Sequence, residues 1–145
     1  CHVAAELIMN ITESVVKYGG AALIIDYGYS KSGVGDTLQA VKDHNYFDIL
    51  SEPGKTDLTA HVDFEYLAEN AKATGGLVHG PVTQRDFLRR IGIEIRSDQL
   101  KNLASTRQKS EVLTGLNRLI GADEMGNLFK VMAITHPSQM SPEGF

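Results

Sequence analysis

The sequence has little cysteine and does not begin with methionine. Cys1 is the only cysteine among 145 residues, so an internal disulfide framework is excluded and the composition fits a reducing compartment. Because the first residue is not methionine, we expect the chain to be processed or cut from something longer. The length suits one domain, and 42% hydrophobic with 22% charged residues is typical of a globular protein.

An excess of positive charge and long apolar runs are also absent. The 14 basic residues are outnumbered by 18 acidic residues, which argues against a dedicated nucleic-acid binder. No apolar stretch approaches the roughly 20 residues that span a bilayer, and the N-terminal segment lacks the layout of a secretory signal. We therefore predict neither a nucleic-acid nor a membrane partner.

The beginning of the sequence predicts a helix followed by a buried strand. Apolar residues recur on one side of the predicted helix at Ala4, Leu7, Ile8, Ile11 and Val15. The run at 21–25 is apolar without alternation, which favours a strand covered on both faces, as in parallel sheets between helices. From residue 27 to about 54 we expect an irregular excursion with a short strand around 37–41.

Helices and strands follow one another in the remainder, so the pattern is α/β. Asp63 stands at the N-cap of a helix that ends before the glycines at 75–76. A short strand follows at 77–79, and Pro81 interrupts it. Thr83 with Asp86 resembles a capping box for a helix through Ile91. Amphipathic helices follow at 98–103 and around 112–120, and the last strand is expected at 128–134. We predict one domain over 1–135 and a loose tail over 136–145.

The strand at 21–25 ends in Asp26, Tyr27 and Gly28, where chemistry is expected. Ligands of α/β sheets lie beyond the carboxyl ends of the strands, and a glycine there permits close backbone approach. Aspartate is also a favoured turn residue. The residues alone therefore leave a ligand site and a capped turn open.

The densest polar cluster is the segment 57–63, with Asp57, Thr59, His61 and Asp63. In an extended chain these alternate residues point to the same side. A metal site would combine His44 with His61, Asp57 and Asp63, whose donors suit zinc or iron. An acid/base site would use His61 as proton acceptor beside a carboxylate. A structural turn, in which Asp57 and Thr59 satisfy backbone donors, is the third interpretation.

Several blocks in order carry a resemblance to a known family. They are LIIDYG (23–28), GDTL (35–38), His44, PG (53–54), DLTAHVDF (57–64), GPVTQ (80–84), FL (87–88), MG (125–126) and FKV (129–131). Together they resemble the C-terminal part of the MidA-type S-adenosylmethionine-dependent methyltransferases.

The resemblance implies an α/β fold that is the C-terminal portion of a Rossmann-like, seven-stranded methyltransferase sheet with helical insertions. The strands at 21–26, about 77–82 and 128–134 would be the last three, and the final one would lie antiparallel between the other two. One side of the first strand should then face a strand that this chain does not contain.

The resemblance also implies an activity. Its mitochondrial members are complex I assembly factors that methylate a protein arginine, so we expect S-adenosylmethionine as cofactor and a protein substrate such as a complex I subunit. The location would be the mitochondrial matrix in a eukaryote and the cytoplasm in a bacterium. The residues expected to act are Asp57, His61 and Asp63 in catalysis, and Asp26, Tyr27, Gly28 and Gln84 in substrate binding. Asp26, Asp57 and Asp63 would hold the arginine, because carboxylates accept its forked donors.

Some elements of that family have no counterpart in the sequence. These are the glycine-rich loop that holds the cofactor, the acidic residue after the second strand and the Asn-Glu segment after the fourth. We therefore predict a fragment whose cofactor-binding residues belong to a missing N-terminal half of the same fold. A non-enzymatic assembly or interaction protein on a degenerate fold is the alternative, and a metal hydrolase is the third. We expect no metal.

Overall fold

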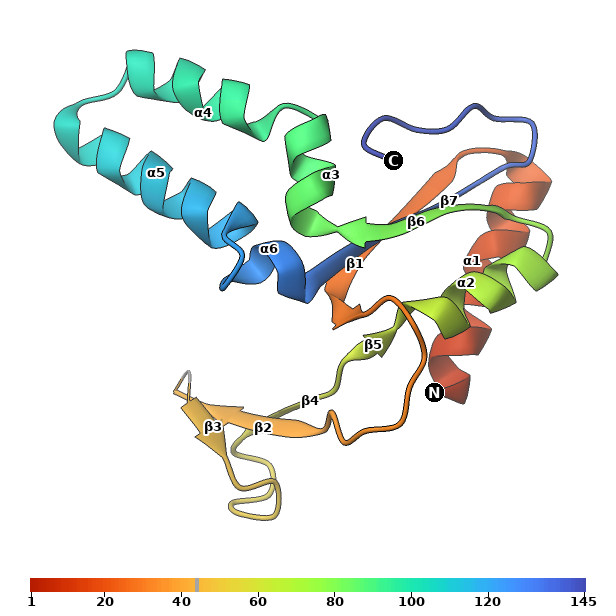
Figure 1. Cartoon of the computed structure of the whole chain (residues 1–145). Coiled ribbons are helices and arrows are strands. Elements are labelled where there is room, and N and C mark those ends of the chain that lie inside the picture. The colour runs from red at the N-terminus through yellow and green to blue at the C-terminus, as the bar shows by residue number, and fades with distance from the viewer. Residues whose placement is uncertain (44) are drawn as a thin grey trace.

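The described residues form two small sheets and six helices. The computed structural model describes residues 1–43 and 45–145, and Figure 1 shows the arrangement of the elements. In chain order they are α1 (His2–Tyr18), β1 (Ala21–Tyr29), β2 (Gln39–Lys42), β3 (Asn45–Phe47), β4 (Asp57–Thr59), β5 (Val62–Asp63), α2 (Phe64–Ala73), β6 (Leu77–Thr83), α3 (Gln84–Arg90), α4 (Ile93–Asn102), α5 (Thr106–Ile120), α6 (Met125–Leu128) and β7 (Phe129–Thr135). None of the described helices is long and apolar enough to cross a membrane.

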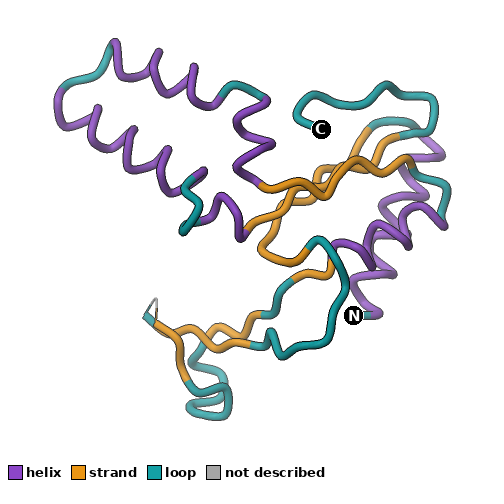
Figure 2. Tube along the Cα trace, viewed as in Figure 1, coloured by secondary structure: helices purple, strands orange, loops and turns teal. Residues whose placement is uncertain are grey.

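The main sheet has the strand order β5-β1-β7-β6. Figure 2 shows the strands in orange and the helices in purple. β7 is antiparallel to β1 along 21–27 and antiparallel to β6 on its other side. The predicted insertion of the last strand between the two earlier ones is therefore confirmed. Lys130 of β7 lies opposite Asp26 of β1. Burial lowers the pKa of the Lys130 ammonium group. Its Nζ donates to the carbonyl oxygen of Leu128 at 3.2 Å.

β1 is less enclosed than the sequence predicted. Residues 21–25 alternate between exposed and half-buried, and Leu23 keeps 53% of its surface exposed. Ala22 and Ile24 pack against the core, whereas Leu23 and Ile25 occupy the other face. The expectation of a strand covered on both faces was wrong for the part of the chain described. On the edge away from β7, β1 pairs with β5 through Gly28 and Tyr29, and among the described residues the rest of that edge has no partner strand.

The main core lies between the sheet and the helices α1 and α2. Its buried members are Ile8, Phe64, Leu67, Ala68, Ala71, Met132 and Ile134. The predicted apolar side of α1 is partly wrong, because Leu7 is exposed and Thr12 is buried. Thr12 can be buried because its hydroxyl donates to the carbonyl oxygen of Ile8 at 2.7 Å. The face of α2 was predicted correctly from Phe64, Leu67, Ala68 and Ala71.

The segment between β1 and α2 is more regular than expected. β2 pairs antiparallel with β3 and with β4, which gives a separate three-stranded sheet in the order β3-β2-β4. The short strand expected around 37–41 corresponds to β2. The irregular excursion is confirmed for 30–38 and 48–54, which contain no helix or strand, but β2 and β3 form regular pairs. Local patterns do not reveal the pairing of β2 with β4, because the paired residues lie up to 20 positions apart.

Pro81 does not end the strand in which it stands. β6 continues through it with a cis Gly80–Pro81 peptide and a shift of register between His79 and Val82. A proline can be accommodated there because a bulge leaves its nitrogen outside the ladder. Thr83 then caps α3 as predicted, with its hydroxyl accepting from the Asp86 amide at 3.1 Å.

The helices α4 and α5 form a hairpin, residues 93–120, that projects from the body of the molecule (Figure 1). α4 begins at Ile93 rather than at the expected residue 98. The start of α5 has a capping box between Ser105 and Gln108. Its predicted apolar face is only partly covered, since Leu113 and Leu119 are exposed while Ile120 is buried.

The segment after β7 contains no helix or strand in residues 136–145. Its end packs back onto β6 and α3: the Phe145 ring lies 6.1 Å from that of His79 and 5.3 Å from that of Phe87. The Arg90 guanidinium donates to the carbonyl oxygen of Gly144 at 3.3 Å. These contacts hold the end of the chain against β6 and α3.

Candidate functional site

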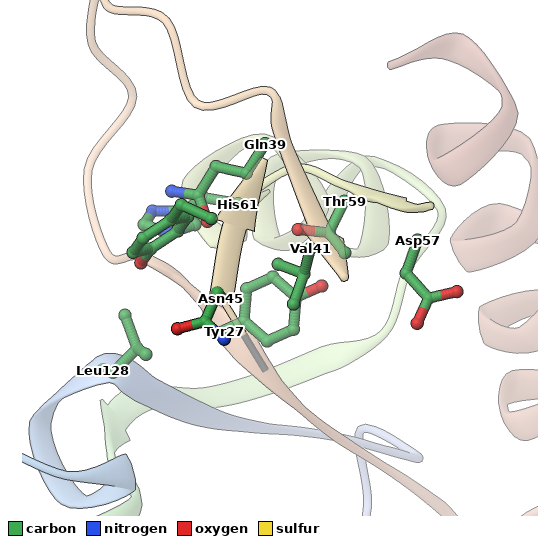
Figure 3. Close-up of a pocket in the computed structure, with 9 residues that line it drawn as sticks. Tyr27, Gln39, Val41, Asn45, Asp57, Thr59, His61 and Leu128 are labelled. Atoms are coloured by element: carbon green, nitrogen blue, oxygen red, sulfur yellow. The ribbon is translucent and has the colours of Figure 1, made fainter. Parts of the chain in front are cut away.

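A pocket of about 500 Å³ lies between the carboxyl end of β1 and the small sheet (Figure 3). It is lined by Tyr27, Gln39, Val41, Asn45, Tyr46, Asp57, Thr59, His61 and Leu128. Tyr27 and Leu128 belong to the main body, and β2, β3 and β4 supply most of the rest. Figure 3 shows Asp57 at one side of the group and Leu128 at the other.

Tyr27 is held at the carboxyl end of β1 by aromatic contacts on two sides. Its ring meets that of His61 edge-on with centroids 5.8 Å apart, and that of Phe129 edge-on at 5.6 Å. Edge-to-face packing is the favoured geometry for such rings. The Tyr27 ring is therefore fixed between β7 and the 57–63 segment.

Gly28 allows the 57–63 segment to approach β1. A Cβ built on Gly28 would stand 2.2 Å from the carbonyl oxygen of Val62, so no larger residue fits without moving backbone. Gly28 and Tyr29 pair in parallel with Val62 and Asp63. This close approach brings His61 beside Tyr27.

The polar residues predicted to share one face are divided by the structure. Asp57 and Thr59 lie on β4, the chain leaves the ladder at 60–61, and Val62 begins β5. Asp57, Thr59 and His61 line the pocket, whereas Asp63 does not. The assumption of one continuous extended segment was wrong, because β4 and β5 belong to different sheets.

Asp63 is the N-cap of α2. One carboxylate oxygen accepts from the Tyr66 amide at 3.0 Å, and both accept from the Ser32 hydroxyl at 2.8 and 2.7 Å. Partial burial, followed by the charge of Asp63 and a hydrogen bond to it, raises the pKa of Tyr29 above 10.0. The carboxylate is thus occupied by the helix end, Ser32 and Tyr29.

Replacing Asp63 separates these roles. Asp63→Ala should lower the free energy of unfolding by about 1 kcal/mol through loss of the cap, whereas Asp63→Asn should keep most of it. Both changes should lower the pKa of Tyr29 toward 10.0, because the negative charge is removed. Because the fold raises this pKa, the protonated Tyr29 side chain contributes to stability below pH 10. This contribution is lost as the pH rises through the raised pKa of Tyr29 in the folded protein.

The Tyr29 pKa can be measured as the difference in ultraviolet titration between the protein and its Tyr29→Phe variant. Urea denaturation gives the free energy of unfolding. An Asp63→Asn protein in which the Tyr29 titration does not move would contradict the electrostatic link.

The other predicted substrate residues lie outside the pocket lining. The Asp26 carboxylate accepts from the Tyr27 amide at 2.8 Å, and Asp26 lies within β1 rather than at a capped turn. Gln84 is buried at the start of α3, and its amide donates to the carbonyl oxygen of Leu119 at 2.8 Å. Gly28 acts through its backbone. The structure therefore brings together Tyr27, Asp57 and His61, and not Asp26, Asp63 and Gln84.

No group of three or more potential metal-ligating His, Cys, Asp or Glu residues comes together within 1–43 and 45–145. His44, which one interpretation of the sequence placed in a metal site, lies outside the described residues. Asp63, another member of that set, is held by Ser32 and the helix end.

Sequence reasoning missed part of the lining. Gln39 and Val41 are two apart on β2, and their alternation with buried Ala40 was a usable signal. Asn45, Tyr46 and Leu128 carried no comparable signal, because the packing of separate elements places them there.

Comparisons with known proteins agree with this topology. Residues 1–82 match the sequence profile of a family described as "Putative S-adenosyl-L-methionine-dependent methyltransferase". The chain belongs to this methyltransferase family. It is 37% identical over 141 residues to "Protein arginine methyltransferase NDUFAF7, mitochondrial" of Xenopus tropicalis, covering 97% of this chain and 32% of that protein. The human protein of the same name is 36% identical over 137 residues, covering 92% and 30%.

A crystal structure of a COG1565 superfamily member from Burkholderia thailandensis, bound to S-adenosyl-homocysteine, has the same fold as this member of the methyltransferase family. The TM-score is 0.86 at 26% identity, over 97% of this chain and 38% of that one. The Rossmann-like methyltransferase fold implied by the resemblance is therefore confirmed. The chain spans about a third of the length of the curated relatives that it matches.

Proposed function

We propose that the protein to which this chain belongs transfers a methyl group from S-adenosylmethionine to an arginine of another protein, and that the pocket receives the arginine side chain. The observation that carries the proposal is a pocket at the carboxyl end of β1 lined by Tyr27, Asp57 and His61 in a methyltransferase fold. Its relatives' name, protein arginine methyltransferase, supports the acceptor class.

The chemistry of the lining suits a guanidinium group. Asp57 supplies a carboxylate for its forked donors, and the faces of Tyr27 and Tyr46 can contact a delocalised cation. The described lining contains no lysine or arginine to repel that cation. His61 can accept the proton that the guanidinium must lose, because neutral imidazole is a base near physiological pH.

The same residues do not fit the methyl donor. S-adenosylmethionine presents an amino-acid end and a ribose diol, whereas the described lining has one carboxylate, no lysine or arginine, and no glycine-rich turn for close approach. When bound, the donor supplies a methyl group on a sulfonium. We infer that its site forms with a further part of the same fold placed along the open edge of β1.

The roles of individual residues follow from this placement. Asp57 orients the acceptor, Tyr27 and Tyr46 flank it, and His61 takes its proton. Asp63, Gly28 and Asp26 act as positioning residues for the segments that carry the pocket, and Gln84 fixes α3 against α5. The resemblance predicts a complex I subunit as the acceptor. It also predicts the mitochondrial matrix as the location in a eukaryote and the cytoplasm in a bacterium; the named relatives are mitochondrial.

Asp57→Asn tests the proposal in the full-length protein. We expect kcat/KM to fall about 10- to 100-fold, because a hydrogen bond to a charged group contributes about 1.5–3 kcal/mol. Methylarginine formed on an arginine-containing peptide is measured by mass spectrometry, with the lysine version of the peptide as specificity control. Asp123→Asn makes the same change at an exposed residue outside the lining and should leave the rate unchanged.

The outcomes separate the competing functions. Equal activity of Asp57→Asn and the parent protein would remove Asp57 from the acceptor site. A full-length protein that binds the arginine peptide and S-adenosylmethionine but forms no methylarginine would favour the non-enzymatic assembly function.

A further inference from the structure

The α4/α5 hairpin carries an apolar groove between its two helices. One hollow of about 500 Å³ lies near the tip, and a second of about 200 Å³ lies nearer the base. Leu100 and Val112 line both hollows, so the two are continuous. We call this continuous surface the hairpin groove.

Large apolar side chains are exposed along the hairpin groove. Leu103 at its tip keeps 95% of its surface exposed, and Leu100 and Leu119 are also exposed. Exposed apolar residues scattered singly need no explanation, but a continuous lined groove marks an interaction surface. An occupant that covered these leucines would gain the free energy of removing them from water.

Ser97 adds a polar feature inside the hairpin groove. Its side chain lines the groove and is 4% exposed, and its Oγ has no hydrogen-bond partner among the described residues. Buried hydroxyl groups are normally hydrogen-bonded. A partner's polar group entering the groove beside Ser97 would satisfy it.

The charge of this region is opposite to that of the whole chain. The hairpin, residues 93–120, contains five basic and three acidic residues, while the chain has 14 and 18. The three acidic residues of the hairpin, Glu94, Asp98 and Glu111, each lie in an ion pair with a neighbouring lysine or arginine. Arg96, Lys109 and Arg118 have no ion-pair partner within the residues described. The surplus charge on the hairpin is therefore positive.

The position of the hairpin separates it from the open edge of β1. The sheet order is β5-β1-β7-β6, and the hairpin follows β6 through α3. A strand added to the open edge of β1 would extend the sheet in the opposite direction. A strand added at that edge would therefore not cover the hairpin groove.

We propose that the hairpin groove binds an acidic amphipathic helix of a partner protein. The apolar residues of such a helix would fill the two hollows, and its acidic residues would face Arg96, Lys109 and Arg118. α4 has 10 residues and is about 15 Å long, which matches about three turns of a partner helix. A concave groove takes one row of side chains, as in helix-in-groove recognition, whereas a membrane needs a flat face. This proposal is independent of methyl transfer.

The test uses the full-length protein and a fluorescein-labelled peptide of about 14 residues, with leucines at helical spacing and glutamates elsewhere. Fluorescence anisotropy should show saturable binding that weakens with salt. Leu103→Glu should weaken binding at least about tenfold, because it removes apolar surface from the groove and places a negative charge beside an acidic peptide. Arg96→Glu should weaken binding and flatten its salt dependence. Leu50→Glu, at an 87% exposed leucine between β3 and β4, is the matched control and should bind like the parent.

Several results would overturn the proposal. They are no saturable binding of the acidic peptide, equal binding of its lysine counterpart, equal affinities of Leu103→Glu and Leu50→Glu, or binding to anionic vesicles in place of the peptide.

A cysteine probe detects an occupant from the same chain. In a Cys1→Ser background, Leu103→Cys should react with a thiol reagent as fast as Leu50→Cys. Protection of Leu103→Cys in the free full-length protein would also overturn the proposal.

Discussion

A valine in place of Gly28 is expected to destabilise the fold by about 3 kcal/mol and to abolish binding of the acceptor peptide. The Cβ atom would lie 2.2 Å from the Val62 carbonyl oxygen and 3.0 Å from the Val62 nitrogen. These are backbone atoms, held by the β1–β5 pairing and by the cap of α2, so they cannot turn aside like a side chain. Overpacking of this kind costs about 1–3 kcal/mol and sometimes more.

The effect on the pocket follows from the same contact. Separating β1 from β5 moves His61 away from Tyr27, whose rings are now 5.8 Å apart. Urea denaturation measures the loss of stability, and anisotropy of a labelled arginine peptide measures binding. Gly33→Val is the matched control, since a Cβ there meets nothing within 4 Å, and it should stay within about 0.5 kcal/mol of the parent. Equal stability of the two variants would show that β1 and β5 need no close approach.

Phe64→Ala is expected to lower the free energy of unfolding by about 3–5 kcal/mol. Phe64 is fully buried in the core cluster with Ile8, Leu67, Met132 and Ile134. Truncation removes the transfer free energy of the ring and leaves a cavity that the sheet and the two helices cannot close. Because domains have only about 5–15 kcal/mol of stability, this variant approaches complete unfolding.

Thermal and urea unfolding followed by circular dichroism measure this change. Phe64→Leu keeps most of the volume and should cost less, so it remains measurable if the alanine variant does not fold. Phe47→Ala makes the same truncation at an exposed position on β3 and should cost much less. A Phe64→Ala protein as stable as Phe47→Ala would contradict the position of the core.

Local sequence patterns predicted those elements whose signals lie within a few residues of each other. Thr83 with Asp86 gave the start of α3, and helical spacing after Asp63 gave α2. The place of β7 came from the family resemblance and is confirmed by its pairing. Leu23 belongs to an apolar run that predicted burial, yet it is exposed. An apolar run indicates a surface that prefers burial, but it does not indicate which molecule or segment covers that surface.

The candidate site was predicted in part because polarity alone does not distinguish a functional carboxylate from a structural one. Asp63 was predicted both as the N-cap of a helix and as a catalytic carboxylate, and in the structure its carboxylate caps α2. Gln84 is occupied by Leu119, 35 residues away, and Tyr46 enters the pocket through pairing of β3 with β2. Such contacts depend on tertiary packing, to which local periodicity is insensitive.

The insertion of β7 between β1 and β6 has a consequence for the order of folding during synthesis. Tyr27 pairs with Phe129, about 100 residues later, and β6 joins the sheet only through β7. Contacts so distant in sequence form slowly, and a growing chain presents its N-terminal elements first. Until residues 129–135 leave the ribosome, β1 and β6 lack the strand that joins them, and their apolar residues stay accessible to chaperones. A nascent chain arrested before β7 should therefore be protease-sensitive throughout the sheet.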